Sequence, residues 1–288
     1  MNILVLGSGG QLGIALKKTP HKDGNRYYFK ERSELDICSL DAVMHFCVEK
    51  EIEVLINCAA YTQVDAAEND AERADLVNHV AVGELARMAK EVDITLIHIS
   101  TDYVFGGEGN KPLKEEDDTK PLGVYGKTKY LGEEAIKQSG CKYLIFRTAW
   151  LYASTGNNFL QTMLQLTANK EEVKVVFDQV GTPTNAADLA RFLVHIIDND
   201  KLLGNEGLYH YTNEGVCSWY DFAWTINKLS RHTCRVLPCY SSQFPSVVRR
   251  PEYSVLDKTK VKKTFQIDIP HWMESLEECI KMINNEKL

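Results

Sequence analysis

Tyr125 and Lys129 form a Y-x-x-x-K pair within a segment whose apolar residues have helical spacing. Residues four apart lie on one face of a helix, so both side chains can address one site. A phenol titrates near about 10, and a cation one helical turn away is expected to lower the pKa of Tyr125. Tyr125 is then a usable general acid for a ketone oxygen. Such a pair also occurs by chance on surface helices, so whether it indicates a catalytic site depends on the segments that precede it.

Thr101 follows a strand-like run, Thr95–Ser100, that lies before the Tyr125 segment in the chain. The carboxyl ends of parallel strands line the ligand crevice in sheets of the type expected here. The Thr101 hydroxyl is therefore predicted to donate a hydrogen bond to the same ketone oxygen and to stabilise its developing charge.

A glycine-rich turn with the spacing G-x-x-G-x-x-G joins the first strand-like run to the first helical segment. Glycine lets the backbone approach a pyrophosphate closely, and the following helix offers free N–H groups and a positive dipole end. A plain turn is the alternative, but the position of this turn within a βαβ unit favours dinucleotide binding. The residues predicted to contact the cofactor here are Gly7, Gly10, Gln11, Leu12 and Gly13.

The end of the second strand-like run bears on the choice of cofactor. Glu31 would accept a hydrogen bond from the ribose 2′-OH of NADH, whereas Lys30 and Arg32 offer two cations to the 2′-phosphate of NADPH. We favour NADPH, with NADH as the alternative, and a solvated surface charge is the other interpretation of Arg32. Asp36 and Ile37 are expected to flank the adenine.

Short apolar runs alternate with helical patterns through residue 150, which predicts a Rossmann-type, doubly wound α/β fold with a parallel sheet. The strand candidates are Ile3–Leu6, Tyr27–Lys30, Val54–Ala59, Thr95–Ser100 and Lys142–Arg147, and the helix candidates are Gln11–Thr19, Ser39–Lys50, Asp70–Glu91 and Tyr125–Ser139. Residues 1–150 are predicted to form the cofactor domain. Residues 151–180 and 213–288 are predicted to form a smaller C-terminal substrate-binding α/β unit, with 181–212 packing back on the first domain.

The overall composition excludes several classes of protein. The formal net charge is −7, which argues against binding nucleic acid, and no apolar run approaches the length of a membrane helix. With no basic, export-type segment at the start, we expect a cytoplasmic protein. Cys234, Cys239 and His232 are the nearest approach to a metal cluster, but they lack a second ligand pair, so reduced thiols are favoured over zinc.

Several longer segments together resemble dTDP-4-dehydrorhamnose reductase, an extended short-chain dehydrogenase/reductase. They are GGQLG, NCAAYTQVDAAE, HISTDYVF, YGKTKYLGE, RTAWLY, GTPTNAADLA and RRPEYSVLD, and they extend over most of the chain. The resemblance implies reduction of the C4 ketone of dTDP-6-deoxy-L-lyxo-4-hexulose to dTDP-L-rhamnose.

The resemblance also implies roles for individual residues. Thr101, Tyr125 and Lys129 take the catalytic positions, and Lys129 would also hold the nicotinamide ribose. The positions implied to line the cofactor are Ala59, Ala60 and Tyr61. The positions implied to contact the substrate are Asp102, Tyr103, Val104, Trp150, Gln179, Thr182 and Arg250, with Pro183 beside them. A core tryptophan is the alternative for Trp150, and Arg249 is the alternative to Arg250 as the diphosphate ligand.

One feature of the family pattern is absent. Some members of the family dimerise around Mg²⁺ held by glutamates, one of which lies in the first helix, but here that helix contains Ile14-Ala15-Leu16-Lys17 and no acidic residue. We therefore expect no metal ligand in this helix. A homodimer stays possible as an alternative, but not one arranged around that metal. Two rival functions remain: a related nucleotide-sugar epimerase, dehydratase or reductase, and a non-catalytic NADP-binding regulatory subunit.

Overall fold

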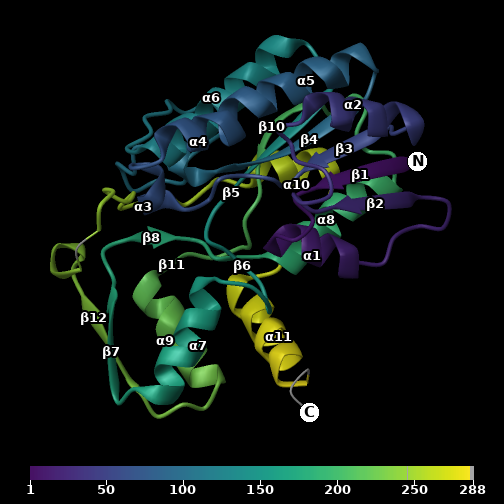
Figure 1. Cartoon of the computed structure of the whole chain (residues 1–288). Coiled ribbons are helices and arrows are strands. Elements are labelled where there is room, and N and C mark those ends of the chain that lie inside the picture. Colours follow the sequence, from purple (N-terminus) through teal and green to yellow (C-terminus); the bar gives the residue numbers. More distant parts are fainter. Residues whose placement is uncertain (245, 286–288) are drawn as a thin grey trace.

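The computed structural model describes residues 1–244 and 246–285, and its centre is a six-stranded parallel sheet (Figure 1). The strands lie in the order β10-β5-β4-β3-β1-β2. Their bounds are β1 (Asn2–Leu6), β2 (Arg26–Lys30), β3 (Val54–Asn57), β4 (Thr95–Thr101), β5 (Tyr143–Thr148) and β10 (Gly207–His210). The strand order reverses between β1 and β3, and a crevice for ligands is expected at the carboxyl ends of the strands on either side of such a point.

Helices cover both faces of this sheet (Figure 1). One face carries α2 (Leu40–Glu49), α4 (Ala71–Asp75), the π-helical turn η1 (Leu76–Val80), α5 (Ala81–Glu91) and α6 (Val124–Ser139). The other face carries α1 (Gln11–Lys18), α8 (Ala186–Asp198) and α10 (Thr259–Phe265). The predicted doubly wound α/β fold is therefore confirmed.

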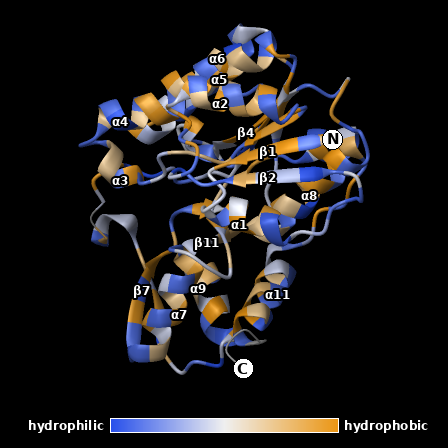
Figure 2. Cartoon of the chain, turned by 45° about the vertical axis from the view of Figure 1, so that its right-hand side comes forward, coloured by the Kyte–Doolittle hydropathy of each residue, from blue (hydrophilic) through white to orange (hydrophobic). Residues whose placement is uncertain are grey.

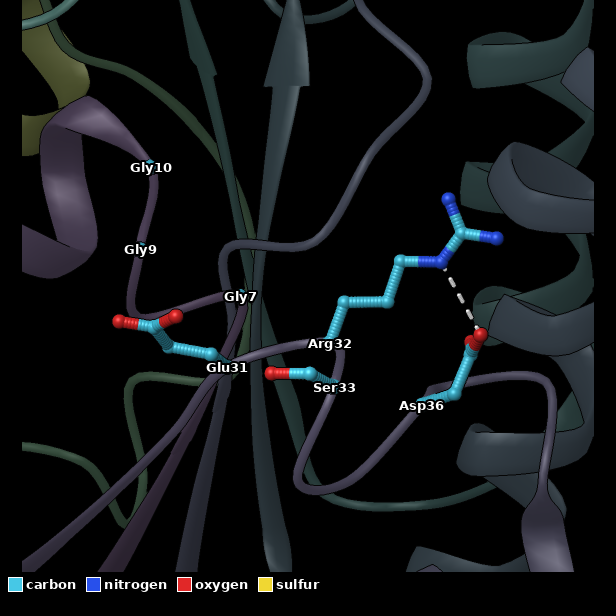
Figure 3. Close-up of a pocket in the computed structure, with 7 residues that line it drawn as sticks. All are labelled: Gly7, Gly9, Gly10, Glu31, Arg32, Ser33 and Asp36. Atoms are coloured by element: carbon cyan, nitrogen blue, oxygen red, sulfur yellow. Dashed lines mark hydrogen bonds and ion pairs between the residues drawn. The ribbon is translucent and has the colours of Figure 1, made fainter.

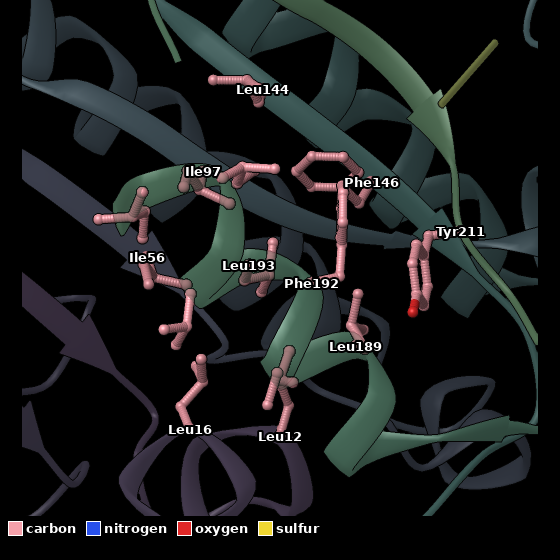
Figure 4. Close-up of a cluster of buried hydrophobic side chains, with 14 of the residues drawn as sticks. Leu12, Leu16, Ile56, Ile97, Leu144, Phe146, Leu189, Phe192, Leu193 and Tyr211 are labelled. Carbon is pink, nitrogen blue, oxygen red and sulfur yellow. The ribbon is translucent and has the colours of Figure 1, made fainter. Parts of the chain in front are cut away.

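The alternation of side chains along each strand divides the core into two layers. In β1, Ile3 and Val5 belong to the cluster under α1 and α8, whereas Leu4 and Leu6 belong to the cluster under α2 and α5. Figure 4 shows the first layer, where side chains of α8 meet those of α1 and of the central strands. Strands buried on both faces are mostly apolar, and β1 and β4 are coloured mainly hydrophobic in Figure 2.

A third apolar cluster lies in the lower part of the molecule (Figure 1). It is built from α7 (Phe159–Asn169), β7 (Glu172–Val176), α9 (Trp219–Leu229), β12 (Arg235–Cys239) and α11 (Trp272–Asn285). Three two-stranded ladders complete this region: β7 with β12, β6 (Leu151–Tyr152) with β9 (Thr184–Asn185), and β8 (Val180–Gly181) with β11 (Cys217–Ser218). Short helices α3 (Val64–Ala67), η2 (Asp102–Val104) and η3 (Ser241–Gln243) lie in connecting segments.

Beyond residue 150, the sequence also predicts strands at 173–177, 207–212 and 235–238 and helices at 185–200, 218–230 and 272–284, which correspond to β7, β10, β12, α8, α9 and α11. The sequence patterns missed the helices α3, α7 and α10 and the short turns η2 and η3. The segment predicted as one helix, 70–91, is interrupted by the π turn. Within 181–212, α8 and β10 pack in the same cluster as β1. The division of the chain near residue 150 and the assignment of 151–180 and 213–288 to a substrate-binding unit stay predictions, and residues 245 and 286–288 lie outside the described residues. No helix in the described part of the chain has the length and apolar character needed to cross a bilayer.

A buried polar cluster joins α8 to α11. The Asp188 carboxylate in α8 accepts hydrogen bonds at Oδ2 from Asn213 Nδ2 at 2.7 Å and from Ser275 Oγ at 2.5 Å. Asn213 Nδ2 also donates to the carbonyl of Pro270 at 3.2 Å. Because each of these groups would be costly to bury without its partners, the cluster fixes α11 relative to the sheet-bound helix α8.

Two glycines let α6 approach its neighbours closely. A Cβ on Gly126 would lie 2.2 Å from the carbonyl oxygen of Tyr103, and one on Gly132 would lie 2.2 Å from the carbonyl oxygen of Asn78 in η1. Both distances are far below contact, and in both cases backbone would have to move. The glycines therefore set the position of the helix that carries Tyr125 and Lys129.

Gly132→Ala tests this constraint. Overpacking against the η1 backbone should lower the free energy of unfolding by about 2 kcal/mol, although alanine is the better helix former. For a chain of this size, that loss corresponds to a fall in Tm of roughly 4–8 °C. Lys127→Ala, at an exposed position of the same helix, should shift Tm little. Equal Tm values for Gly132→Ala and the unsubstituted protein in thermal denaturation would contradict the close packing.

Candidate active site

A cavity of about 1030 Å³ opens at the carboxyl ends of β1, β3 and β4. It begins at the glycine turn, passes along the ends of the central strands and reaches the lower part of the molecule at Trp150 and Trp219. The predicted site residues that line it are Gly7, Gly10, Gln11, Leu12, Gly13, Arg32, Asp36, Ile37, Ala59, Ala60, Tyr61, Thr101, Asp102, Tyr103, Tyr125, Lys129, Trp150 and Arg250. Segments from seven parts of the sequence therefore meet around one space.

The glycine turn has the geometry of an anion cradle. Gly7 has a φ of +73°, and a Cβ there would lie 2.6 Å from the backbone nitrogen of Ala59. A Cβ on Gly13 would lie 2.4 Å from Ser8 Cα. Gly10 is the N-cap of α1, and no side chain caps that end of the helix. The free N–H groups at the start of α1 therefore face the cavity and fit a dinucleotide pyrophosphate.

A smaller pocket of about 560 Å³ adjoins the glycine turn, and Figure 3 shows the residues around it. Glu31 is directed toward Gly9, whereas Arg32 extends the opposite way and its Nε lies 3.1 Å from Asp36 Oδ2. The Arg32 side chain is 71% exposed, so this ion pair is weak and leaves the guanidinium available to a ligand. Lys30 instead pairs with Glu34 at 3.6 Å and lies over the Phe46 ring, so it lines neither space.

Tyr125 lies beside Thr101 and Asp102 at the centre of the large cavity. Burial raises the pKa of Tyr125 to about 12; the hydrogen bond with Thr101 opposes this shift and the charge of Asp102 adds to it. The lowered pKa expected from the sequence is thus wrong for the free protein, because loss of water outweighs the neighbouring groups. The raised pKa keeps the phenol protonated at neutral pH but makes it a weaker acid than a free tyrosine, so proton donation by Tyr125 depends on a cation that stabilises the phenolate.

Asp102 is 2% exposed, and burial raises the pKa of its carboxyl to about 6, opposed by hydrogen bonds from Ser254 and Thr101. The Tyr103 ring meets the Tyr125 ring edge-on, with centroids 5.5 Å apart. Asp102 and Tyr103 both lie in η2, which follows β4 directly, so they are held against the end of the strand that carries Thr101.

Lys129 is 2% exposed and lies one helical turn beyond Tyr125. Its Nζ donates to the carbonyl oxygen of Ile99 at 2.6 Å and lies 3.1 Å from Nε2 of His98. Burial lowers the pKa of Lys129 to about 8, while the charges of Glu133 and Cys58 oppose that shift. A lysine of this kind can hold or release a proton near neutral pH.

Aromatic side chains form the far end of the cavity. Trp150 stacks on Trp219 with ring centroids 3.6 Å apart and an interplanar angle of 9°. Trp150 has a φ of +49°, an unfavourable value for a bulky residue, and a Cβ on Gly181 would lie 2.7 Å from its ring. The backbone strain and close packing together fix the indole at the cavity wall.

Arg250 lines the cavity, and its guanidinium lies 3.1 Å from Asp65 Oδ2. Arg249 pairs instead with Glu252 at 3.1 Å and is not among the lining residues. The geometry therefore favours Arg250 over Arg249 as the cation that faces a ligand.

Three predicted substrate residues do not line the cavity in this structure. Val104 packs in an apolar cluster with Phe105 and Leu256. Gln179 donates to Ser241 Oγ at 2.9 Å, and Thr182 donates to the carbonyl of Gly215 at 2.8 Å. The side chains of Gln179 and Thr182 therefore join loops of the lower region, and that of Val104 packs beside α6.

Several functional candidates were missed by the sequence patterns. Asn78 is fully buried in the π turn, accepts from the backbone N–H of Tyr61 at 2.9 Å and donates to Thr128 Oγ1 at 3.2 Å. It thereby joins the loop that follows β3 to α6, and single π turns occur frequently at functional sites. Arg73 and Trp219 line the cavity from segments with no recognisable motif.

No group of three or more His, Cys, Asp or Glu side chains suited to a metal ion occurs within residues 1–244 and 246–285. Cys234 and Cys239 are free, buried thiols.

Comparisons with known proteins agree with this geometry. Residues 1–285 match the family described as RmlD substrate binding domain. A dTDP-4-dehydrorhamnose reductase of Escherichia coli K12 is 37% identical over 296 residues, covering 97% of each chain.

Two solved structures are also close. A dTDP-4-dehydrorhamnose reductase of Clostridium acetobutylicum superposes with a TM-score of 0.93 at 42% identity, covering 99% of this chain and 100% of that one. A Bacillus anthracis dTDP-4-dehydrorhamnose reductase in complex with NADP has a TM-score of 0.93 at 34% identity, covering 98% of this chain and 99% of that one. With a family match across the chain and relatives of this similarity over its full length, the protein belongs to the dTDP-4-dehydrorhamnose reductase family.

Proposed function

We propose that this protein reduces the C4 ketone of dTDP-4-dehydro-L-rhamnose to give dTDP-L-rhamnose, with NADPH as the reductant. The observation that carries the proposal is the meeting of Thr101, Tyr125 and Lys129 in the same cavity as the Gly7–Gly13 turn. Family membership supports the substrate, since the Escherichia coli relative carries the name dTDP-4-dehydrorhamnose reductase.

Tyr125 is the proposed proton donor. When bound, NADPH supplies the hydride that the ketone carbon accepts. The oxygen of that ketone takes the proton of Tyr125, and the Thr101 hydroxyl donates a hydrogen bond to the same oxygen. Because the pKa of Tyr125 is raised to about 12, the phenolate left behind needs a nearby cation, and protonated Lys129 supplies it.

Cofactor contacts are proposed from the two adjoining pockets. The pyrophosphate would lie on the Gly7–Gly13 turn, and the adenosine 2′-phosphate near Arg32, with Glu31 beside the glycines. Ala59, Ala60 and Tyr61 would line the cofactor from the end of β3. The NADP bound in the Bacillus anthracis relative supports NADPH as the reductant.

The substrate is proposed to lie between Tyr125 and the tryptophan pair. Trp150 offers an aromatic face to the sugar ring, and Arg250 offers its guanidinium to the diphosphate once it leaves Asp65. Asp102 and Tyr103 would contact the sugar beside the ketone. A dehydratase needs an acid and base pair next to Thr101, whereas here Asp102 is followed by Tyr103, which disfavours that rival.

The direct test is product analysis after incubation with the dTDP-linked 4-keto-6-deoxy sugar and either NADPH or NADH. We expect dTDP-L-rhamnose to form with NADPH consumed in equal amount. Cofactor binding without turnover on a panel of keto-sugar nucleotides would instead favour a non-catalytic regulatory subunit.

Tyr125→Phe should lower kcat by about 100-fold or more, because it removes the proton donor and leaves the ring that packs on Tyr103. NADPH binding, measured by fluorescence titration, should change only a few-fold. Tyr143→Phe removes a hydroxyl outside the cavity and should keep near-normal turnover. Normal turnover by Tyr125→Phe would show that another group donates the proton.

Activity should fall at alkaline pH. Because burial lowers the pKa of Lys129, its positive charge is present below about pH 8 and is lost as the pH rises through that value. The plot of kcat/KM against pH should therefore decline through this region, with circular dichroism used to check that the fold persists. A profile that stays level for more than about one unit above pH 8 would exclude a required Lys129 cation.

Arg32→Ala should raise the KM for NADPH by about tenfold, since a charge-assisted hydrogen bond to phosphate is lost. The KM for NADH should change little, because NADH lacks that phosphate. Arg87→Ala, at an exposed arginine on α5, should leave both constants near their original values. Equal effects of Arg32→Ala on the two cofactors would argue against 2′-phosphate recognition at this position.

A further inference from the structure

A chain of buried polar contacts connects Asn57 at the end of β3, through His98 in β4, to Lys129 in α6. Asn57 and His98 are paired across the two strands, and they are 1% and 0% exposed. Asn57 Nδ2 lies 3.1 Å from His98 Nδ1, and His98 Nε2 lies 3.1 Å from Lys129 Nζ. Neither Asn57 nor His98 has a role in the proposed reaction, but their hydrogen-bond chain ends at Lys129, which does.

The orientation of the Asn57 amide follows from its second contact. The backbone N–H of Ala59 points at Asn57 Oδ1 at 3.0 Å. Because a backbone N–H can only donate, the atom facing it must be the amide oxygen. The NH₂ group is therefore the part that faces the imidazole, and it too can only donate. His98 Nδ1 must accept this hydrogen bond.

The tautomer of His98 then follows. Burial, with a smaller contribution from the charge of Lys129, holds the pKa of His98 well below its usual value, so the ring is neutral. A neutral imidazole carries one hydrogen, and Nδ1 is already the acceptor. The hydrogen must be on Nε2, which is the nitrogen that faces Lys129 Nζ.

An ammonium group has three hydrogens and no lone pair, so protonated Lys129 would direct an N–H group at the Nε2–H of His98. A neutral amine accepts that hydrogen and still donates to the carbonyl of Ile99. We propose that Asn57 and His98 are positioning residues that hold the imidazole as its Nε2–H tautomer and thereby favour the neutral amine of Lys129.

Other ionisable groups around Lys129 also affect the balance between its charged and neutral forms. Glu133, one turn further along α6, and Cys58, which follows β3, favour the charged form. The Glu133 carboxylate is itself bound by Arg147 of β5 at 2.7 and 2.9 Å and by Ser100 of β4 at 2.5 Å, which limits its effect. Tyr125 on α6, with Asp102 beside it, completes the ionisable surroundings on the cavity side.

The catalytic consequence rests on the proposed reductase function. After Tyr125 gives its proton to the ketone oxygen, it must regain one before the next turnover. Protonated Lys129 can pass a proton to the phenolate, become the neutral amine and regain a proton from water, which requires its charged and neutral forms to be close in free energy. The His98 donor shifts Lys129 toward that balance.

The tautomer can be measured without any assay of activity. In the full-length protein labelled with ¹⁵N-histidine, long-range ¹H–¹⁵N correlation spectra distinguish the two neutral tautomers and the doubly protonated ring. His98 is identified by through-bond connection to its backbone, so no variant is needed. We expect the Nε2–H pattern at neutral and mildly alkaline pH. An Nδ1–H pattern, or a doubly protonated ring, would overturn the proposal.

Two substitutions test the effect on Lys129. The carboxylate of Asn57→Asp accepts hydrogen bonds from both Ala59 and His98, so the ring should change to Nδ1–H and present Nε2 as an acceptor. His98→Gln can turn its carbonyl oxygen toward Lys129 without adding charge. His45→Gln, at an exposed histidine on α2, is the matched control.

The readout is the titration of Lys129, followed by its ¹³Cε chemical shift in ¹³C-lysine-labelled protein and, separately, by the alkaline decline of kcat/KM. Asn57→Asp and His98→Gln should each move both midpoints upward by about one pH unit, a tenfold change in the proton equilibrium. His45→Gln should move neither. Unmoved ¹³C midpoints in both folded variants would overturn the proposal. Absence of turnover in every form would instead count against the proposed function and leave the tautomer result standing.

Discussion

The close approach of α6 to β4 and β5 is the constraint on which the site depends. It places three residues at successive turns of one helix face, Tyr125, Lys129 and Glu133, against the sheet. Glu133 and Arg147 are almost fully buried and form a bidentate ion pair, so neither charge is left uncompensated in the interior. Breaking such a pair typically costs about 3–5 kcal/mol, which makes the position of the helix hard to change.

The same approach explains why two ionisable groups of the site have shifted pKa values. Loss of water is the largest cause for both Tyr125 and Lys129, and it acts in opposite directions on a phenol and an amine. The phenol is kept protonated and the amine is brought near neutral pH. An acid that holds its proton, next to a base that can exchange one, is an arrangement suited to reducing a ketone.

The sequence predicted the fold well because its signals are local. Short apolar strands, helical spacing and the glycine turn predict a doubly wound sheet without knowledge of long-range contacts. Thr101, at the end of a strand, and Tyr125 and Lys129, on one helix face, can then be identified as candidate catalytic residues. The missed helices show the limit: α7 and α10 acquire their apolar partners only when the lower region and the sheet are assembled. The pKa of Tyr125 was predicted with the wrong sign for a related reason, since burial depends on the whole surroundings and spacing reports only one neighbour.

The residues that support the site were the hardest to predict. Asn57, Asn78 and His98 are fully or almost fully buried polar side chains within strands or a π turn, and in the sequence each stands in an ordinary apolar run. Each makes hydrogen bonds to groups that are distant in sequence: Asn78 binds the backbone N–H and carbonyl of Tyr61, whereas His98 contacts the side chains of Asn57 and Lys129. By contrast, Arg32 and Glu31 are exposed at the rim, where charge alone suggests a ligand contact. The solvent-exposed residues of the site can therefore be predicted from residue type, whereas the buried residues that support it can be identified only from the three-dimensional structure.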